Sequence, residues 1–525
     1  MGERPVSAAP TGKGPPSWKL AAPHDQRTQG LVVSGFASLP TGRALFLEFG
    51  WDGALATGGG AWLKALEAGV APVTDSDGRD PRAVALGVTC SGLQKMGLPK
   101  ETLQSFDLPF REGMFQEDRL RRLGDRRGPD WLKTVIEGGP LWSGNTPPAD
   151  PELGEAQVRT PVTVHALLLL YAPDEPMAES WCEEVSAALE PHKVKVAHRL
   201  HLDLRLDERG IAREHFGFAD GISQPVPYEE GVVVRGGAPI DPASEPWNGV
   251  PLGEVLMGHV NGHHEIAAGP IVVDSPRARE AGLAPHAQAE GFLDLGLDGS
   301  YMVVRELKQN VAEFWQSLEA AAAAMRAADP EHSGQVTADW LAERVIGRDR
   351  DGNLLCPAGV LPPDSFDQPE NEFGFFDRDL HGFGCPVGSH VRRGNPRDGL
   401  APTAADKPTL LAAANNHRIL RRGRKYGPTI AKRDEKDGTD RGLLFIALNT
   451  DVTRQFEFVQ QTWMLNRNFA TLYDEADPLL GPAGTMTIRE QPLRRIIAVD
   501  TFVQMAGGEY FFLPSMPAIR YLAGL

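Results

Sequence analysis

The chain of 525 residues carries 53 lysines and arginines against 70 aspartates and glutamates, which gives a formal net charge of −17. This charge disfavours binding to nucleic acid or to an anionic membrane surface, and the sequence contains no apolar run long enough to predict a transmembrane helix. Hydrophobic residues make up 41% of the chain, while 57 glycines and 43 prolines predict many surface loops. We therefore expect a globular protein of two or three domains.

Residues 1–28 contain neither an apolar signal-peptide core nor a twin arginine, so they predict a flexible N-terminal arm. The cysteines form no C-x-x-C pair and are few for this length, which predicts isolated free thiols in a reducing compartment. They are Cys90, Cys182, Cys356 and Cys385. We therefore expect a cytoplasmic protein.

The first half of the chain alternates strand-like and helical patterns. Residues 30–50 predict two extended runs interrupted by Pro-Thr-Gly, and residues 162–174 and 193–205 predict strands on either side of an amphipathic helix over 175–191. The glycines of a dinucleotide-binding turn are missing. This half therefore indicates an α+β unit.

The second half repeats this organisation. Residues 299–307 predict a strand that leads into a helix with an apolar stripe, and residues 441–464 predict a strand, a short break and a second helix with such a stripe. Residues 494–515 predict two strand-like runs around Gly507 and Gly508. The stripes are Val311, Phe314, Trp315 and Leu318 in the first helix, and Val452, Phe456, Val459 and Trp463 in the second. Two α+β units of similar content are thus expected.

Two segments rich in glycine and proline, residues 225–298 and 327–375, predict insertions that form surface loops. The first contains His259, His263 and His264, but Asn261 and Gly262 argue against a metal-binding helix there. The second contains a sequence that lacks the ligands of a calcium loop. Walker A, G-x-S-x-G and H-E-x-x-H motifs are also missing from the sequence, which disfavours the commonest nucleotide, serine-hydrolase and zinc-protease sites.

Four positions carry candidate chemistry. Asp220 lies in "FGFADGISQP", where an Asp-Gly turn is the simplest interpretation, and His390 lies in "CPVGSHVRRGNPRD". Arg421 belongs to the cationic segment "RILRRGRKYGP", and Asp451 follows a predicted strand, where it could cap a helix. Each of these residues alone has an ordinary structural explanation.

Together and in this order, the segments resemble those of the dye-decolourising peroxidases, a family of haem proteins. The resemblance rests on "FGFADGISQP" for the family's GxxDG motif, "CPVGSHVRRGNPRD" for its haem-histidine segment, "RILRRGRKYGP" for its distal-arginine segment and "GGEYFFLPS" near the C-terminus. It extends over about residues 30–520. Length and insertions are similar to those of the longer bacterial subgroup.

The resemblance implies a role for each candidate residue. His390 would be the proximal ligand of the haem iron, and Asp220 and Arg421 would be the distal carboxylate and arginine that act on peroxide. Asp451 would accept a hydrogen bond from His390 Nδ1 and raise the basicity of this ligand.

Four further residues are expected at the cofactor. Gly217 and Gly221 would let the backbone lie close to the porphyrin, because glycine has no Cβ. Arg393 and Arg397 would hold the haem propionates. The alternative for both arginines is a surface ion pair with neighbours such as Asp398.

The family fold implied by the resemblance is α+β: two ferredoxin-like domains of antiparallel sheets and helices, of the dimeric α/β-barrel type, over residues 29–215 and 216–525. The implied function is a peroxidase with one haem b per chain that reduces hydrogen peroxide and oxidises bulky phenolic or dye-like donors by one-electron steps. The alternative function is a haem-binding or iron-releasing protein, which would need His390 but neither Asp220 nor Arg421. A monomer and a homodimer are both compatible with the sequence.

Overall fold

The computed structural model describes residues 18–52, 58–77, 81–128, 130–145, 159–208, 210–355, 357, 371–490 and 494–525. None of the helices in these ranges combines the length and the apolar character that crossing a bilayer requires.

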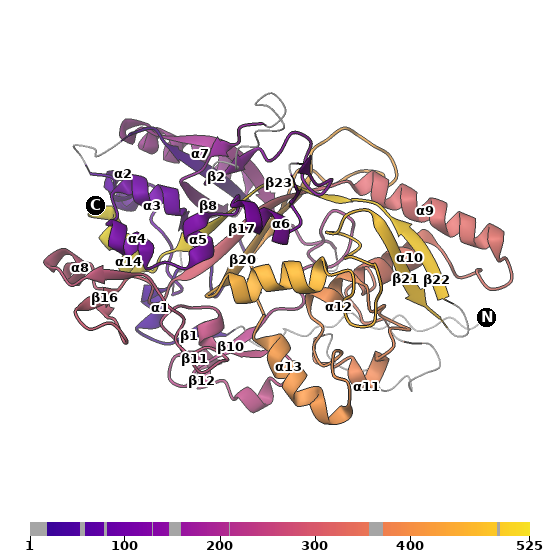
Figure 1. The fold of residues 1–525 in the computed structure, drawn as a ribbon. Coiled ribbons are helices and arrows are strands. Elements are labelled where there is room, and N and C mark those ends of the chain that lie inside the picture. Colours follow the sequence, from indigo (N-terminus) through magenta and orange to yellow (C-terminus); the bar gives the residue numbers. More distant parts are fainter. Residues whose placement is uncertain are drawn as a thin grey trace.

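An antiparallel sheet closes into a barrel-like ring at the centre of the molecule (Figure 1). Neighbouring strands of the ring are hydrogen-bonded in the order β17 (Ser300–Gln309), β20 (Gly442–Asn449), β19 (Arg424–Tyr426), β9 (Val194–Asp203), β2 (Thr41–Phe49), β8 (Ala166–Ala172), β3 (Ala83–Val88) and β23 (Val503–Leu513). The ring closes because β23 also pairs with β17, from Ser300 opposite Leu513 to Gln309 opposite Val503. Short strands extend the sheet: β18 (Leu420–Arg421), β6 (Trp142–Ser143) and β7 (Val162–Thr163).

Alternation along the strands divides the core into two layers, since successive side chains of a strand point to opposite faces. In β2, Ala44 and Phe46 belong to the cluster enclosed by the ring, to which β17 and β20 also contribute. Leu45 and Leu47 belong to the cluster on the outer face. Nearly every side chain of β2, β3, β8 and β23 is therefore buried, which explains their continuous apolar runs, whereas β9 exposes Lys195, Arg199 and His201.

The outer face of the N-terminal strands is covered by helices. The main one is α7 (Glu175–Leu189), which Asp174 caps by accepting a hydrogen bond from the Met177 N–H, and which buries Trp181 and Val185. Helix α2 (Ala61–Ala65) packs against α7, and the C-terminal α14 (Met516–Ala523) packs against α2. The other short helices of this half are α3 (Cys90–Met96), α4 (Lys100–Gln104), α5 (Leu108–Glu112) and α6 (Glu117–Arg122). This half thus forms a closed apolar layer.

The C-terminal strands have a different surrounding. Helix α9 (Val311–Ala328) buries Val311, Phe314, Trp315 and Leu318, which confirms the predicted stripe. It packs on α10 (Ala338–Ile346) and contacts β22 of the hairpin β21 (Gly484–Arg489) and β22 (Arg494–Val499), and it extends away from the ring (Figure 1). The smaller helices α12 (His390–Gly394), α11 (Phe376–Asp379) and α13 (Lys407–Asn415) lie below it in this view.

The structure differs in part from two sequence predictions about irregular regions. In the predicted arm, residues 18–28 are ordered: Trp18 and Leu20 are buried, β1 (Lys19–Leu20) pairs with β11 (Val233–Arg235), and α1 (His24–Arg27) follows. Residues 1–17 lie outside the described ranges. The two predicted surface insertions also contribute core residues, because they fold into short elements whose apolar side chains complete the layers: Leu252, Leu256, Leu293, Leu341 and Val345.

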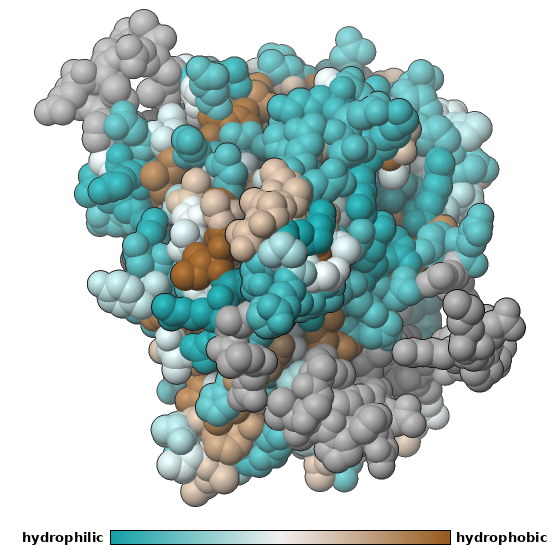
Figure 2. Space-filling model, turned by 90° about the vertical axis from the view of Figure 1, so that its right-hand side faces the viewer, coloured by the Kyte–Doolittle hydropathy of each residue, from teal (hydrophilic) through white to brown (hydrophobic). Residues whose placement is uncertain are grey.

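These short elements of the first insertion are the strands β10 (Val226–Tyr228), β12 (Ala238–Pro239), β13 (Gly249–Pro251), β14 (Ile271–Val273), β15 (Ala284–Pro285) and β16 (Phe292–Asp294), with helix α8 (Pro276–Glu280). Figure 2 shows a largely hydrophilic face with scattered hydrophobic patches, as expected for a strongly charged globular protein.

Two predicted elements differ in form. The expected helix after β20 is π-helical, in the segments η7 (Thr453–Glu457) and η8 (Val459–Met464), although its predicted apolar residues are buried. Gly507 and Gly508 lie within the single strand β23 rather than between two strands. A Cβ at Gly507 would lie 2.2 Å from Trp142 Nε1. The close approach of the Trp142 indole to the backbone therefore requires glycine at this position.

Candidate functional site

A cavity of about 270 Å³ opens between the outer face of the C-terminal strands and the helices beside them. Adjoining cavities measure only about 20 to 50 Å³. Its apolar walls come from β17, β20, β23 and the π-helical segments, through residues that include Leu307, Leu443, Phe445, Phe456, Val459 and Val503. Its polar lining includes His390, Asp220 and Arg421, so the structure brings together three residues that are far apart in the sequence.

His390 begins α12 and lines the cavity. Its Nδ1 lies 3.1 Å from Asp477 Oδ2 and 3.2 Å from Oδ1. Asp477 is 1% exposed and also accepts hydrogen bonds from the backbone N–H groups of Leu479 and Leu480. Because Nδ1 is held by this carboxylate, Nε2 is the nitrogen left to bind a ligand.

His390 and Asp477 each shift the pKa of the other toward its charged form. Burial lowers the pKa of His390, but the charge of Asp477 and the hydrogen bond to it raise this pKa more, so that the net change is upward. Burial raises the pKa of Asp477, and His390 together with the backbone donors lowers it below its ordinary value. Asp477 is therefore an ionised acceptor that strengthens the electron-donating character of the imidazole.

The prediction that Asp451 accepts the His390 hydrogen bond is wrong. Asp451 Oδ1 accepts a hydrogen bond from the Arg454 N–H at 2.8 Å, and its Oδ2 lies 3.6 Å from Arg454 Nε. It therefore stabilises the start of the π-helical segment, the capping role that the sequence also allowed. Sequence reasoning missed Asp477, which lies 87 residues after His390 and whose one local signal is the turn that it forms with Leu479 and Leu480.

Asp220 and Arg421 form an ion pair in the cavity wall, with Arg421 Nη1 3.2 Å from Asp220 Oδ1. Their side chains are 34% and 33% exposed, so both can meet a ligand. Gln224 fixes the backbone of Arg421 with two hydrogen bonds, to its N–H and to its carbonyl oxygen. Arg421 Nη2 also donates to the carbonyl oxygen of Ser223.

The turn that carries Asp220 is held by Glu214, which accepts hydrogen bonds from the N–H groups of Phe216 and Phe218. Gly221 lines the cavity with a φ of +79° and open space on its Cβ side, which fits a close approach of a ligand. Gly217 does not line this cavity: a Cβ there would meet Arg350 Nη2 at 2.6 Å. Its φ of +96° explains the glycine, so the expected contact with a porphyrin is corrected to a turn requirement.

The two predicted propionate ligands have different environments. Arg393 is fully buried outside the cavity lining and donates to the backbone carbonyl oxygens of Gly388, Trp463, Met464, Asn466 and Glu475. These bonds tie α12 to the chain that surrounds Asp477. Arg393 is therefore a structural arginine, and both the propionate role and the surface ion pair are wrong for it.

Arg397 lines the cavity together with Arg348 and Arg418. Burial lowers the pKa of Arg397 far below its ordinary value, and the charges of Arg418 and Arg348 lower it further. Burial and the charge of Arg421 lower the pKa of Arg418 to about 10, and Arg418 Nη2 is a buried donor without a hydrogen-bond partner among the described residues. A cluster of buried cations with an unused donor calls for an anionic ligand.

The residues of the cavity thus suit a large flat apolar group that carries a metal ion and acidic substituents. His390 offers one imidazole nitrogen, Arg418 offers an unused donor to an acid group, and the Asp220–Arg421 pair offers a base and a cation at the same space. A haem fits these features, because its iron takes a histidine ligand and its propionates require cationic partners.

Comparisons with curated proteins agree with this chemistry, although no protein-family model matches the chain. The dye-decolorizing peroxidase msp1 of Mycetinis scorodonius is 29% identical over 436 residues, which cover 77% of this chain and 75% of the relative. The multifunctional dye peroxidase DyP2 of Amycolatopsis is 28% identical over 71% of this chain and 74% of its own.

Solved structures share the fold. The DyP-type peroxidase of Anabaena superposes with a TM-score of 0.66 at 20% identity, over 95% of this chain and 94% of that one. The Auricularia auricula-judae enzyme AauDyP, solved with imidazole, gives a TM-score of 0.68 at 20% identity, over 95% and 99% of the two chains. In sequence and in its barrel-like α/β fold, the chain is therefore similar to dye-decolourising peroxidases.

Proposed function

We propose that the protein is a haem-dependent peroxidase that reduces hydrogen peroxide and oxidises bulky phenolic or dye-like donors in one-electron steps. The observation that carries the proposal is the arrangement in one cavity of His390, held through Nδ1 by Asp477, with the Asp220–Arg421 ion pair. A haem carrier would need the histidine alone. The paired base and cation therefore favour the enzyme over the haem-handling alternative.

The cofactor in this proposal is one haem b per chain, which supplies a redox-active iron for cleavage of the peroxide O–O bond. His390 Nε2 would bind the iron, and Asp477 would fix the ring and its tautomer. Arg418 and Arg397 would balance the propionates, and Arg418 Nη2 has no hydrogen-bond partner among the residues that the structure describes. Gly221 would allow the backbone of its turn to lie close to the porphyrin.

Asp220 and Arg421 have complementary tasks in this proposal. Heterolytic cleavage of peroxide requires a proton to leave the inner oxygen and to reach the outer one, and the Asp220 carboxylate can carry it. Arg421 is permanently cationic and can stabilise the negative charge that develops on the departing oxygen. Because Gln224 and Ser223 hold Arg421, this charge is oriented before the substrate arrives.

The proposal also covers the division into domains, the cellular environment and the oligomeric state. The ring divides into strands from residues 29–215 and from residues 216–525, which supports two ferredoxin-like domains with these boundaries. The free thiols of Cys90, Cys182 and Cys385 support a reducing, cytoplasmic environment, while Cys356 lies outside the described residues. A monomer or a homodimer would serve this reaction equally well, since the cavity is built by one chain.

The test is peroxide-dependent oxidation of an anthraquinone dye and of 2,6-dimethoxyphenol by the purified haem-loaded protein. A peroxidase gives turnover of at least one donor that depends on both peroxide and haem. A haem-loaded protein that binds haem through His390 but shows no turnover above that of free haem would support the carrier alternative.

A further inference from the structure

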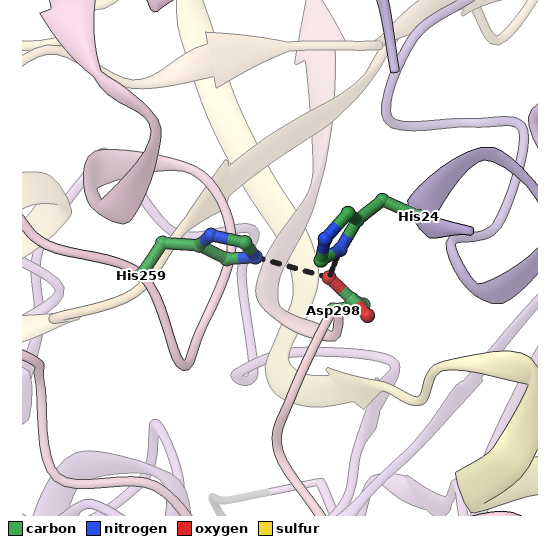
Figure 3. Close-up of side chains that lie close together, drawn as sticks. All are labelled: His24, His259 and Asp298. Carbon is green, nitrogen blue, oxygen red and sulfur yellow. Dashed lines mark hydrogen bonds and ion pairs between the residues drawn. The ribbon is translucent and has the colours of Figure 1, made fainter. Parts of the chain in front are cut away.

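A second cluster of ligand-type side chains lies away from the cavity, where three separate segments meet (Figure 3). His24 begins α1 near the N-terminus, His259 belongs to the first insertion, and Asp298 precedes β17. Asp298 is 1% exposed and His259 is 6% exposed, while the His24 side chain is 22% exposed. The sequence disfavoured a metal-binding helix at His259, and the structure supplies partners from distant segments instead.

Both imidazoles point at one carboxylate oxygen. His24 Nδ1 lies 2.8 Å and His259 Nε2 lies 3.0 Å from Asp298 Oδ1. Ligand atoms around a tetrahedral zinc ion lie about 3.3 Å apart, because zinc–nitrogen bonds are about 2.0–2.1 Å long. A small outward shift of these three atoms would therefore make room for an ion between them.

The surroundings orient these atoms as they would in a metal site. Glu229 Oε2 lies 2.9 Å from His259 Nδ1, so that His259 presents Nε2 to the cluster. A carboxylate behind a metal-binding histidine is a common arrangement that fixes the ring. Arg27 Nε donates to Asp298 Oδ2 at 2.7 Å, which leaves Oδ1 as the single oxygen available to an ion.

We propose that His24, His259 and Asp298 bind a divalent transition-metal ion through His24 Nδ1, His259 Nε2 and Asp298 Oδ1. Two imidazoles and one carboxylate suit zinc and neighbouring first-row metals, and a water molecule that enters beside the partly exposed His24 completes a four-coordinate ion. The ion ties the N-terminal segment to the first insertion and to the start of β17. This role is structural and independent of the haem cavity.

The proposal is tested on the haem-loaded protein with zinc as the probe. After dialysis against dilute zinc chloride, zinc and iron are counted per chain by mass spectrometry, and thermal unfolding is recorded with and without zinc. We expect about one zinc ion per chain and a zinc-dependent rise in Tm for the parent. The His24→Ala variant, which removes the least buried side chain of the three, should lose both the bound zinc and the zinc-dependent rise in Tm. The control His332→Ala, which removes an exposed histidine that pairs with Asp329, should keep both.

X-ray absorption at the zinc edge of the parent keeps the test decisive if His24→Ala unfolds. Two imidazole ligands among nitrogen and oxygen donors support the site. A parent that binds no zinc, a His24→Ala variant that is folded and retains the parent's zinc, or an absorption spectrum without imidazole ligands would each overturn it.

Discussion

The two halves of the barrel-like ring use similar strands but differ in what covers them. On the N-terminal side, α7 lies directly on β2 and β8 and closes the layer with Trp181 and Val185. On the C-terminal side, α9 packs on α10 and β22 and extends away from the ring (Figure 1). The outer faces of β17 and β20 are left to line the large cavity, through residues such as Leu307 and Phe445.

This difference shows how one architecture gives a stable layer in one half and a binding site in the other. Where a helix lies on the sheet, apolar side chains fill the space to the density of a core. Where α9 leaves the sheet uncovered, apolar strand residues of the same kind form the walls of the cavity. Short elements such as α12 place polar side chains in this cavity. The π-helical turns on this wall fit the tendency of such turns to occur at functional sites.

The largest expected effect is in the C-terminal half. His390→Ala removes the imidazole that would hold the iron, so we expect loss of most bound haem with an unchanged barrel, measured by haem content and circular dichroism. The matched control is His417→Ala. His417 lines the same cavity, but it stacks on Phe458 at 3.7 Å and its Nδ1 lies 2.5 Å from the Arg454 carbonyl oxygen, so its loss spares the ligand. If His390→Ala kept its full haem content and an absorption spectrum typical of histidine-bound iron, a residue other than His390 would be the iron ligand.

The N-terminal half should respond to pH through His165. Burial is the main cause that lowers the pKa of this residue to about 4 from 6.5, with a contribution from Lys95, and its Nδ1 accepts a hydrogen bond from the Phe49 N–H. Between pH 6.5 and 4 the unfolded chain binds the proton and the folded chain does not. The free energy of unfolding therefore falls as the pH drops through this window, by roughly 3 kcal/mol from this residue.

Denaturant unfolding at a series of pH values measures this loss. His165→Asn keeps an acceptor for the Phe49 N–H but does not titrate, so its stability should decline less steeply between pH 6.5 and 4 than that of the parent. His192→Asn in the same half serves as the control and should keep the parental slope. Identical slopes for His165→Asn and the parent would show that His165 does not contribute.

A smaller effect distinguishes Asp477 from Asp451. Asp477→Asn leaves a neutral partner at His390 Nδ1, so we expect an upward shift of the iron reduction potential on the order of tens of millivolts. Asp451→Asn should leave the potential unchanged and have little effect on stability, because the asparagine oxygen can still accept the hydrogen bond from the Arg454 N–H. Redox titration of both haem-loaded variants checks this, and a shift in Asp451→Asn alone would reverse the assignment.

The sequence predicted the local parts of this structure well, because they depend on neighbouring residues. The stripe of α9 and the apolar runs of the strands follow directly from periodicity. His390, Asp220 and Arg421 were recognised through motifs, and the structure places all three in one cavity.

The errors concern contacts between distant segments. Asp477 was missed because nothing in its neighbourhood indicates that it meets a histidine 87 residues away. The role of Arg393 was wrong because an arginine that donates to five backbone carbonyl oxygens has the same sequence signature as one that binds an anion. The order of residues 18–28 depends on pairing with Val233 and Val234, which no local pattern predicts.

The most direct test of the site is the rate at which peroxide changes the haem spectrum in Arg421→Leu and in Asp220→Asn. In stopped-flow mixing, we expect Arg421→Leu to retain its haem and to react roughly 10²-fold or more slowly than the parent, since a charge-stabilising donor is lost. Asp220→Asn should also be slower and should change the pH profile. The control Arg467→Leu breaks an exposed ion pair with Asp474 and should react like the parent. If both cavity variants hold full haem and react as fast as the parent, the proposed peroxidase site is contradicted.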